Sequence, residues 1–292
     1  MKIQFSLGAL LRFLLLPGGV LCVVWIGNLI RNEHLSFLDV TIIALSTLGV
    51  IGVAMLFRLP IFSFLGMYSS GLRLTSATLA DMPEDADGRD YILYQHSFFS
   101  YQLGNFAEAL RALEAIDIGN VPEAICPLVG LNRALILEAL FRAREAEEAL
   151  EGYDESDFTN RMYAQWQACL ANAKAGLGLD LEEALSLVES AFTKNPSAKI
   201  ATVMGHVLWR MEHHEAAFSW FSYALKRMPR RERHFKSYTL FLQGRLFRDL
   251  GDENSAMQFF NRALASAPSP ECRELYKKNW NVSRRRRSMA RG

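Results

Sequence analysis

Histidines are the side chains in this sequence best suited to acid–base or metal chemistry. His213 and His214 are adjacent, so on a helix they would project toward different faces. No further His, Cys or acidic residue lies one turn away in a ligand pattern, whereas a zinc site needs three or four such side chains at one point. His206, one turn before Trp209, suits a binding surface better. The spacing predicts no metal site and gives the adjacent pair a structural or solvent-facing role.

Two further patterns could carry chemistry. Gly176 and Gly178, in AGLGLD, fall at a turn between two expected helices, where glycine ends a helix by adopting positive φ. They do not form the glycine-rich loop that cradles phosphate. The acidic run of Glu145, Glu147 and Glu148 predicts a solvated helix face. We therefore expect no catalytic residue, no cofactor and no enzymatic activity.

The cysteines do not form a framework. Cys22 lies within an apolar run, and Cys126, Cys169 and Cys272 are scattered without paired or metal-like spacing. Such thiols behave as small apolar residues in a reducing compartment. We expect them to be reduced and structural.

A repeated pattern of small and apolar residues identifies the elements that position these side chains. A small residue is followed by an apolar one after four positions, a small one after seven and a proline after twelve. The three sets are Ala184, Val188, Ala191 and Pro196; Ala217, Phe221, Ala224 and Pro229; and Ala256, Phe260, Ala263 and Pro268. Small residues let two helices approach closely, and proline then ends the helix. The pattern predicts helical hairpins.

These landmarks resemble the tetratricopeptide repeat (TPR) family, whose units are antiparallel helix pairs with a period of about 34 residues. A further unit fits through Leu103, Gly104, Asn105, Phe106, Ala109, Leu113 and Ile116, and a degenerate one through Ala149 and Tyr153. The resemblance implies an all-α solenoid of about five hairpins over residues 90–268, followed by a C-terminal capping helix over 269–283. The alternative is another α-solenoid or an irregular helical bundle.

Two uncharged apolar runs precede the repeats, over residues 13–30 and 40–57. A helix of that length spans roughly 27 Å, close to the thickness of a bilayer core. Residues 1–58 therefore predict a transmembrane hairpin. The alternative for the first run is a cleaved signal peptide, but no small-residue cleavage site follows it.

Cations flanking the two runs predict their orientation. Lys2 and Arg12 precede the first run, and Arg58 and Arg73 follow the second. Cytoplasmic ends carry the excess of Lys and Arg, so we expect a two-span protein of the bacterial inner membrane with both termini in the cytoplasm. Residues 59–89 are interpreted as an interfacial segment and an acidic linker, or alternatively as an N-terminal cap on the first repeat.

Charge is strongly segregated along the chain although the formal net charge is only +1. Residues 81–229 carry twelve Lys and Arg against twenty-three Asp and Glu, and residues 230–292 carry fifteen against six. The tail, 284–292, contains Arg284, Arg285, Arg286 and Arg287. Clustered arginine attracts anionic lipid, nucleic acid or an acidic protein, or the tail is simply solvated. No nucleic-acid-binding motif accompanies it.

The TPR resemblance also implies a recognition surface, because the first helix of each TPR unit lines a concave face. The residues of this sequence at those positions are Tyr91, Tyr94, Phe98 and Tyr101; Lys199, Thr202, His206 and Trp209; and Tyr238, Phe241, Arg245 and Arg248. Aromatic residues and arginine often dominate binding energy. In the TPR subtype that clamps a C-terminal carboxylate, the first helix carries Lys-x3-Asn. Tyr94 and Phe98 stand at those places here, which argues against that subtype.

The sequence thus predicts a membrane-anchored, cytoplasm-facing TPR scaffold that binds protein partners. Its layout resembles the TPR subunit of Pel-type exopolysaccharide secretion and, less closely, the HemY family of haem metabolism. The alternative is a solenoid that binds a small ligand for an associated enzyme. A deep apolar pocket with convergent polar groups would favour that alternative, and an open groove would favour a protein partner.

Overall fold

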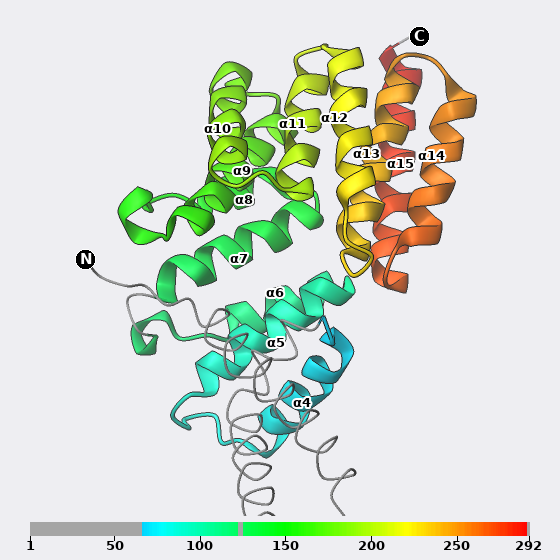
Figure 1. The fold of residues 1–292 in the computed structure, drawn as a ribbon. Coiled ribbons are helices and arrows are strands. Elements are labelled where there is room, and N and C mark those ends of the chain that lie inside the picture. Colours follow the sequence, from blue (N-terminus) through cyan, green and yellow to red (C-terminus); the bar gives the residue numbers. More distant parts are fainter. Residues whose placement is uncertain (1–65, 122–124, 291–292) are drawn as a thin grey trace, which may run out of the picture. The chain divides into compact units, whose positions relative to one another are not determined.

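The computed structural model describes residues 66–121 and 125–290, with side chains up to Asn281 apart from that of Asn120. The chain divides into two compact units, residues 1–61 and 62–292. All regular secondary structure in the described part of the second unit is helical (Figure 1).

The helices follow one another as hairpins, preceded by one helix and followed by another. Their bounds are α4 Tyr68–Asp81; α5 Arg89–Leu103 with α6 Phe106–Glu114; α7 Cys126–Ala139 with α8 Ala143–Glu148; α9 Asn160–Leu177 with α10 Leu181–Lys194; α11 Ala198–Arg210 with α12 His214–Arg227; α13 Arg233–Asp249 with α14 Glu253–Ser266; and α15 Pro270–Ala290. Short 3₁₀ turns, η1 Ile118–Asn120 and η3 Glu155–Asp157, follow the first two hairpins. The predicted all-α repeat solenoid is confirmed for this part of the chain.

The prediction of two membrane-spanning helices in an inner-membrane protein is corrected. Within the described ranges, no helix is both long and apolar enough to cross a bilayer. The described helices place apolar residues against one another and charged residues on their remaining faces. Helix α15 has 21 residues, which is long enough to span a bilayer, but it carries the RRRR run and is therefore not apolar enough. The runs over 13–30 and 40–57 lie outside the described residues.

A left-handed residue ends the first helix of every hairpin. These residues are Gly104, Phe141, Gly178, Glu212 and Gly251, with φ between 60° and 84°. The left-handed conformation reverses the chain and satisfies carbonyl groups at the end of the helix. It costs glycine little, whereas Phe141 and Glu212 adopt it against a steric penalty. The five residues define corresponding positions in the five hairpins.

The sequence landmarks pack between the paired helices as predicted. All three pairs of repeat alanines have no exposed surface. A Cβ atom on Gly205 would lie 2.7 Å from the Phe221 ring, and one on Gly244 would lie 3.2 Å from the Ala256 carbonyl oxygen. Helices α10, α12 and α14 each end two residues before the landmark proline, as expected where the pyrrolidine ring prevents helix continuation.

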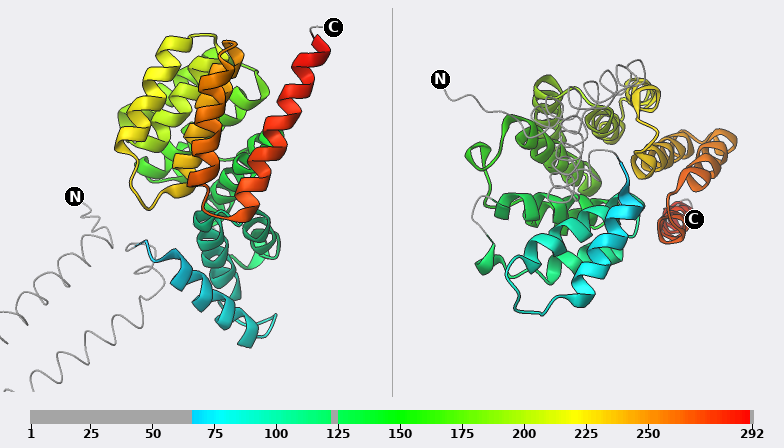
Figure 2. Two further views of the ribbon diagram at one scale, coloured as in Figure 1. Left: turned by 90° about the vertical axis from the view of Figure 1, so that its right-hand side faces the viewer. Right: turned by 60° about the horizontal axis from the view of Figure 1, so that its bottom comes forward.

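The first hairpin contacts the last part of the chain. Ser269 Oγ donates a hydrogen bond of 2.7 Å to the Gly104 carbonyl, and the Ala107 amide donates one of 2.8 Å to Glu271 Oε1. The rings of Tyr101 on α5 and His234 on α13 lie 4.6 Å apart. Helix α15 thus begins beside the first hairpin (Figure 2, left). The inner face of the hairpins is closed on this side.

Helices α4 and α15 cover apolar surface of the first and last hairpins that would otherwise be exposed. Gly71 of α4 lies against the ring of Phe99, and Thr75 Oγ1 is 3.1 Å from His96 Nδ1 on α5. Tyr276 of α15 stacks on Phe241 of α13 at 4.8 Å. A solenoid needs such coverage because its terminal repeats lack a neighbour.

Candidate functional site

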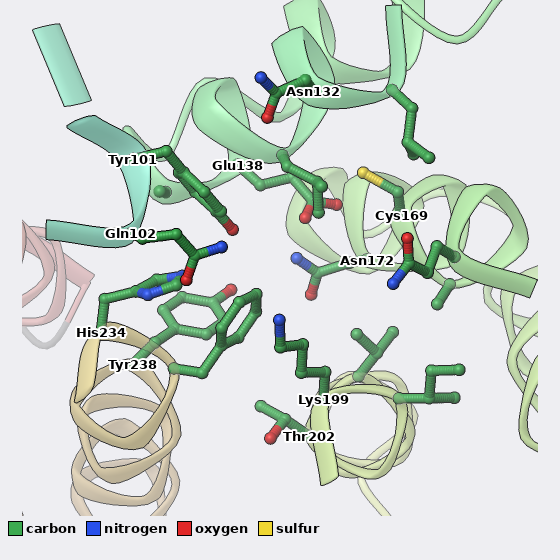
Figure 3. A pocket seen from close by; sticks show the side chains of 18 of the residues that line it. Tyr101, Gln102, Asn132, Glu138, Cys169, Asn172, Lys199, Thr202, His234 and Tyr238 are labelled. Atoms are coloured by element: carbon green, nitrogen blue, oxygen red, sulfur yellow. The ribbon is translucent and has the colours of Figure 1, made fainter. Parts of the chain in front are cut away.

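The first helices of the hairpins enclose a cavity of about 180 Å³, which we name the aromatic cavity (Figure 3). A single water needs roughly 10–15 Å³ of such volume, so the cavity has room for a side chain or a small molecule. Its aromatic lining consists of Tyr94, Phe98, Tyr101, Phe106, Phe235, Tyr238 and Tyr276. Its polar lining consists of Gln102, Asn132, Gln165, Glu138, Asn172, Ser197, Lys199, Thr202 and His234.

Several polar side chains converge within this apolar wall. Figure 3 shows the polar ends of Tyr101, Gln102, Asn172 and Lys199 directed toward a common space. These residues come from α5, α9 and α11, so the convergence is a property of the assembled repeats and not of one helix. An apolar wall with a few convergent polar groups can hold a small molecule or a single side chain of a partner.

Glu138 is the only acidic residue lining the aromatic cavity among the described residues. Burial raises the pKa of its carboxyl group from 4.5 to about 8, although hydrogen bonds with Asn172 and Cys169 oppose the rise. Its Oε1 atom is buried and has no hydrogen-bond partner. At neutral pH the carboxyl group is therefore predominantly protonated.

Gln102 and His234 add further unsatisfied polar atoms to the same wall. The Gln102 carboxamide oxygen and both His234 ring nitrogens are buried without hydrogen-bond partners, and the two residues are 6% and 3% exposed. Burial lowers the pKa of His234 well below its usual value, with a smaller contribution from Lys199. Buried polar groups are normally paired, so these atoms mark the wall as a place where a ligand would supply partners.

A second space of about 410 Å³, the cationic cavity, adjoins the first and shares Glu138, Asn172 and Tyr238 with it. Its remaining polar and charged lining consists of His206, Trp209, Arg210, Arg245, Arg248, Asp249 and Asn279. Three arginines against one aspartate and one protonated glutamate give this space a positive potential.

Hydrogen bonds and ring contacts order the cationic cavity. His206 Nδ1 lies 2.7 Å from Asn172 Oδ1, and Trp209 Nε1 donates to Asp249 Oδ2 at 3.1 Å. The guanidinium groups of Arg245 and Arg210 lie 5.1 Å and 6.0 Å from the Trp209 ring centre. Burial, followed by the charges of those two arginines, lowers the pKa of His206 to about 3. His206 is therefore neutral, and the arginines carry the positive charge.

Most of the predicted concave-face residues line one of the two cavities. Those in the aromatic cavity are Tyr94, Phe98, Tyr101, Lys199, Thr202 and Tyr238; those in the cationic cavity are His206, Trp209, Tyr238, Arg245 and Arg248. Tyr91 is 43% exposed, and Phe241 is fully buried; neither lines a cavity. The side chains of Arg284, Arg285, Arg286 and Arg287 lie beyond the described ones.

Glu138 was missed as a site residue because its hairpin, α7–α8, lacks clear sequence landmarks. Asn172 was missed although its hairpin, α9–α10, has them, because no inner-face positions were assigned to α9 from the sequence. The helix ends would have located them. Asn172, His206 and Arg245 each lie six residues before a left-handed residue, and Glu138 and Arg248 each lie three before one. Polar residues at corresponding positions of successive first helices were the signal.

The structure also places the two glycines and the acidic run that the sequence singled out. Gly178 ends α9 at φ 72°, as predicted, whereas Gly176 lies within that helix. The acidic run is not wholly solvated, because Glu147 lies 3.7 Å from the buried Lys174 ammonium group. Among the described residues, no group of three His, Cys, Asp or Glu side chains could hold a metal ion.

Comparison with known proteins agrees with this architecture. The tetratricopeptide repeat family matches residues 237–270, which contain most of α13, all of α14 and the first residue of α15. A Rap protein solved in complex with competence and sporulation factor is 14% identical, with a TM-score of 0.53, and the match covers 78% of this chain and 65% of that one.

Two MamA structures are also similar over parts of the chain. One, MamA MSR-1 C2, is 16% identical over 62% of this chain and 97% of that one, with a TM-score of 0.35. Another is 18% identical over 58% and 93% of the two chains, with a TM-score of 0.33. No curated protein matches in the sequence comparison. The family match shows a tetratricopeptide repeat at residues 237–270, and the similarity to the Rap protein shows a shared helical-repeat fold.

Proposed function

We propose that this chain is a helical-repeat adaptor that holds a segment of a protein partner against the inner face of its five hairpins. The observation that carries the proposal is the convergence of corresponding positions on two adjoining cavities. Aromatic residues and arginine, the types that most often dominate binding energy, occupy those positions. The Rap protein, which shares the fold, was solved with a bound factor.

The charge of the cationic cavity indicates the chemistry of the bound segment. Arg210 and Arg245 both lie near the Trp209 ring, and both side chains are only partly buried. A carboxylate placed between two such arginines forms charge-assisted hydrogen bonds, which are stronger than neutral ones. An acidic residue of the partner therefore fits this end of the inner face.

Arg248 has a structural role that separates it from the other two arginines. It is 3% exposed, donates a 3.0 Å hydrogen bond to the Trp280 carbonyl and lies 4.1 Å from the Trp280 ring centre. Its removal would loosen α15 from α13. A test of binding should therefore leave Arg248 in place.

The experiment compares two double variants of the full chain. In Arg210→Gln with Arg245→Gln, recovery of co-purifying proteins from the native cells should fall more than tenfold, because paired interface cations are worth about 2–5 kcal/mol. The control, Arg161→Gln with Arg233→Gln, removes the same charge from exposed positions and should recover partners normally. Circular dichroism should show unchanged helicity in both. Equal recovery by the two variants would refute the proposal.

Neither exopolysaccharide secretion nor haem metabolism is proposed. Both assignments depended on a layout with a membrane hairpin, which the described helices do not provide.

A further inference from the structure

We infer that the aromatic cavity is a binding site for a monovalent organic cation, an alkylammonium or guanidinium group that pairs with Glu138 inside an aromatic wall. This site differs from the cationic cavity and does not require that a protein partner occupy the inner face.

The charges of the aromatic cavity favour a cation. In the part of the chain that the structure describes, Glu138 has no ion-pair partner. The cavity's one lysine, Lys199, is already paired, since its Nζ atom lies 2.8 Å from Glu232 Oε2. His234 is neutral because burial lowers its pKa. The cavity thus contains one acid without a counter-ion.

The unsatisfied atoms favour a hydrogen-bond donor. Glu138 Oε1 and Gln102 Oε1 are both buried acceptors without partners, and a neutral histidine such as His234 has one further acceptor nitrogen. Ammonium and guanidinium groups are donors only. A cation therefore supplies donors to the Glu138 and Gln102 oxygens, whereas a carboxylate, which only accepts, would leave the Gln102 oxygen unpaired.

The aromatic rings favour the same ligand. Tyr94, Phe98, Tyr101, Phe235 and Tyr238 line the cavity, and ring faces attract cations, most strongly where water is excluded. Lys199 shows this attraction within the protein, since its Nζ atom lies 4.4 Å from the Phe235 ring centre. A hydrocarbon stem on the ligand would fill the apolar remainder of the cavity.

Binding of a cation should release a proton. In the empty cavity Glu138 is protonated up to about pH 8, and a cation stabilises the ionised form, so the carboxyl proton leaves as the ligand enters. The neighbouring groups do not titrate in this range. Burial raises the pKa values of Tyr101 on α5, Cys169 on α9 and Tyr238 on α13.

Charged and titratable groups also face Glu138 from the other helices that line the two cavities. These groups are Lys199 on α11, which pairs with Glu232, and Arg245 on α13, beside Trp209; His206 on α11 stays neutral because its pKa is about 3. Below pH 8 the affinity should therefore rise about tenfold per pH unit, following Glu138 alone.

The test is calorimetry on the purified full-length chain with butylammonium and butylguanidinium as probes, and with pentanol and butyrate as neutral and anionic controls. Titration at pH 7 in two buffers of different ionisation enthalpy counts the protons released. We expect both cations to bind with release of nearly one proton, and neither control to bind. Both probes remain charged at pH 7, as lysine and arginine do, so the proton comes from the protein.

Two variants separate the site from its surroundings. Glu138→Gln keeps the size of the side chain but cannot ionise, so it should weaken cation binding at least tenfold and abolish proton release. Lys199→Met removes a nearby positive charge and should strengthen cation binding. Binding of butyrate that is lost in Lys199→Met, or cation binding that is unchanged in Glu138→Gln, would overturn the inference.

A further arm identifies the source of the cation. If a capped alanine pentapeptide with one central lysine displaces butylammonium and its norleucine analogue does not, the occupant is a peptide side chain. If butylammonium binds and the lysine peptide does not compete, the occupant is a small amine. The Arg210→Gln with Arg245→Gln variant should bind butylammonium normally, so failure of the proposed partner site is distinguishable from failure of this one.

Discussion

Glu138→Gln should make the protein more resistant to unfolding at alkaline pH. In the folded chain the carboxyl group has a pKa of about 8 because it is buried, whereas in the unfolded chain it titrates near 4.5. Between these values the unfolded state has released the proton and the folded state has kept it. The contribution of Glu138 to the free energy of unfolding is therefore fully present below pH 4.5 and is lost as the pH rises to about 8.

The expected magnitude is large. The shift corresponds to a loss of about 5 kcal/mol between pH 4.5 and pH 8, at about 1.4 kcal/mol per pH unit. Whole domains are stable by only about 5–15 kcal/mol. His206 and His234 act in the opposite direction, because their lowered pKa values make stability fall as the pH drops below about 6.5. Stability should thus be greatest near pH 6.5.

Urea unfolding followed by circular dichroism between pH 5 and pH 9 tests this. The wild-type chain should lose stability from pH 6.5 to pH 8, and Glu138→Gln should lose almost none over that interval. Glu148→Gln changes an exposed glutamate and should follow the wild type. An equal alkaline loss in Glu138→Gln would show that this carboxyl group does not remain protonated in the folded chain.

Two predictions concern packing. Ala256→Trp should lower the melting temperature at a cost of about 1–3 kcal/mol or more, because Ala256 has no exposed surface; an unchanged temperature would contradict the hairpin packing. Gly104→Ala should be costlier than Gly251→Ala. Both glycines have φ near 80°, but only at Gly104 would a Cβ atom meet another group, the Pro268 ring at 2.7 Å. Hydrogen exchange should then increase at Ser269 in the first variant only; equal effects would indicate that this contact contributes nothing.

The hairpins were predictable from sequence because their contacts are local. Ala217 and Phe221 recur at fixed offsets and pack within one unit, so the spacing alone identifies the helix pair. The α7–α8 hairpin was less clear because it uses a different close approach: a Cβ atom on Gly130 would lie 2.6 Å from the Tyr153 ring. Its reversal at Phe141 has φ 60°, a conformation that no residue preference would suggest there.

The cavities were not predictable because they depend on contacts distant in sequence. The hydrogen bond from Ser269 to Gly104 joins residues 165 positions apart, and it forms only if small rotations between successive hairpins accumulate correctly. Without this closure, Tyr101 and His234 would not meet. The sequence indicated which residues face inward, but not which of them share an enclosed space.

Enclosure explains why the two cavities should select opposite charges. Burial keeps Glu138 protonated and His206 neutral when the cavities are empty. These two groups therefore do not screen the charge of an entering ligand. Electrostatic interactions are also stronger there than at an exposed surface. A partner segment carrying a cation and an acid a few residues apart would place the cation at Glu138 and the acid between Arg210 and Arg245. Reversal would put each charge beside a like one, which costs several kcal/mol at an interface, and the segment would therefore bind in one direction.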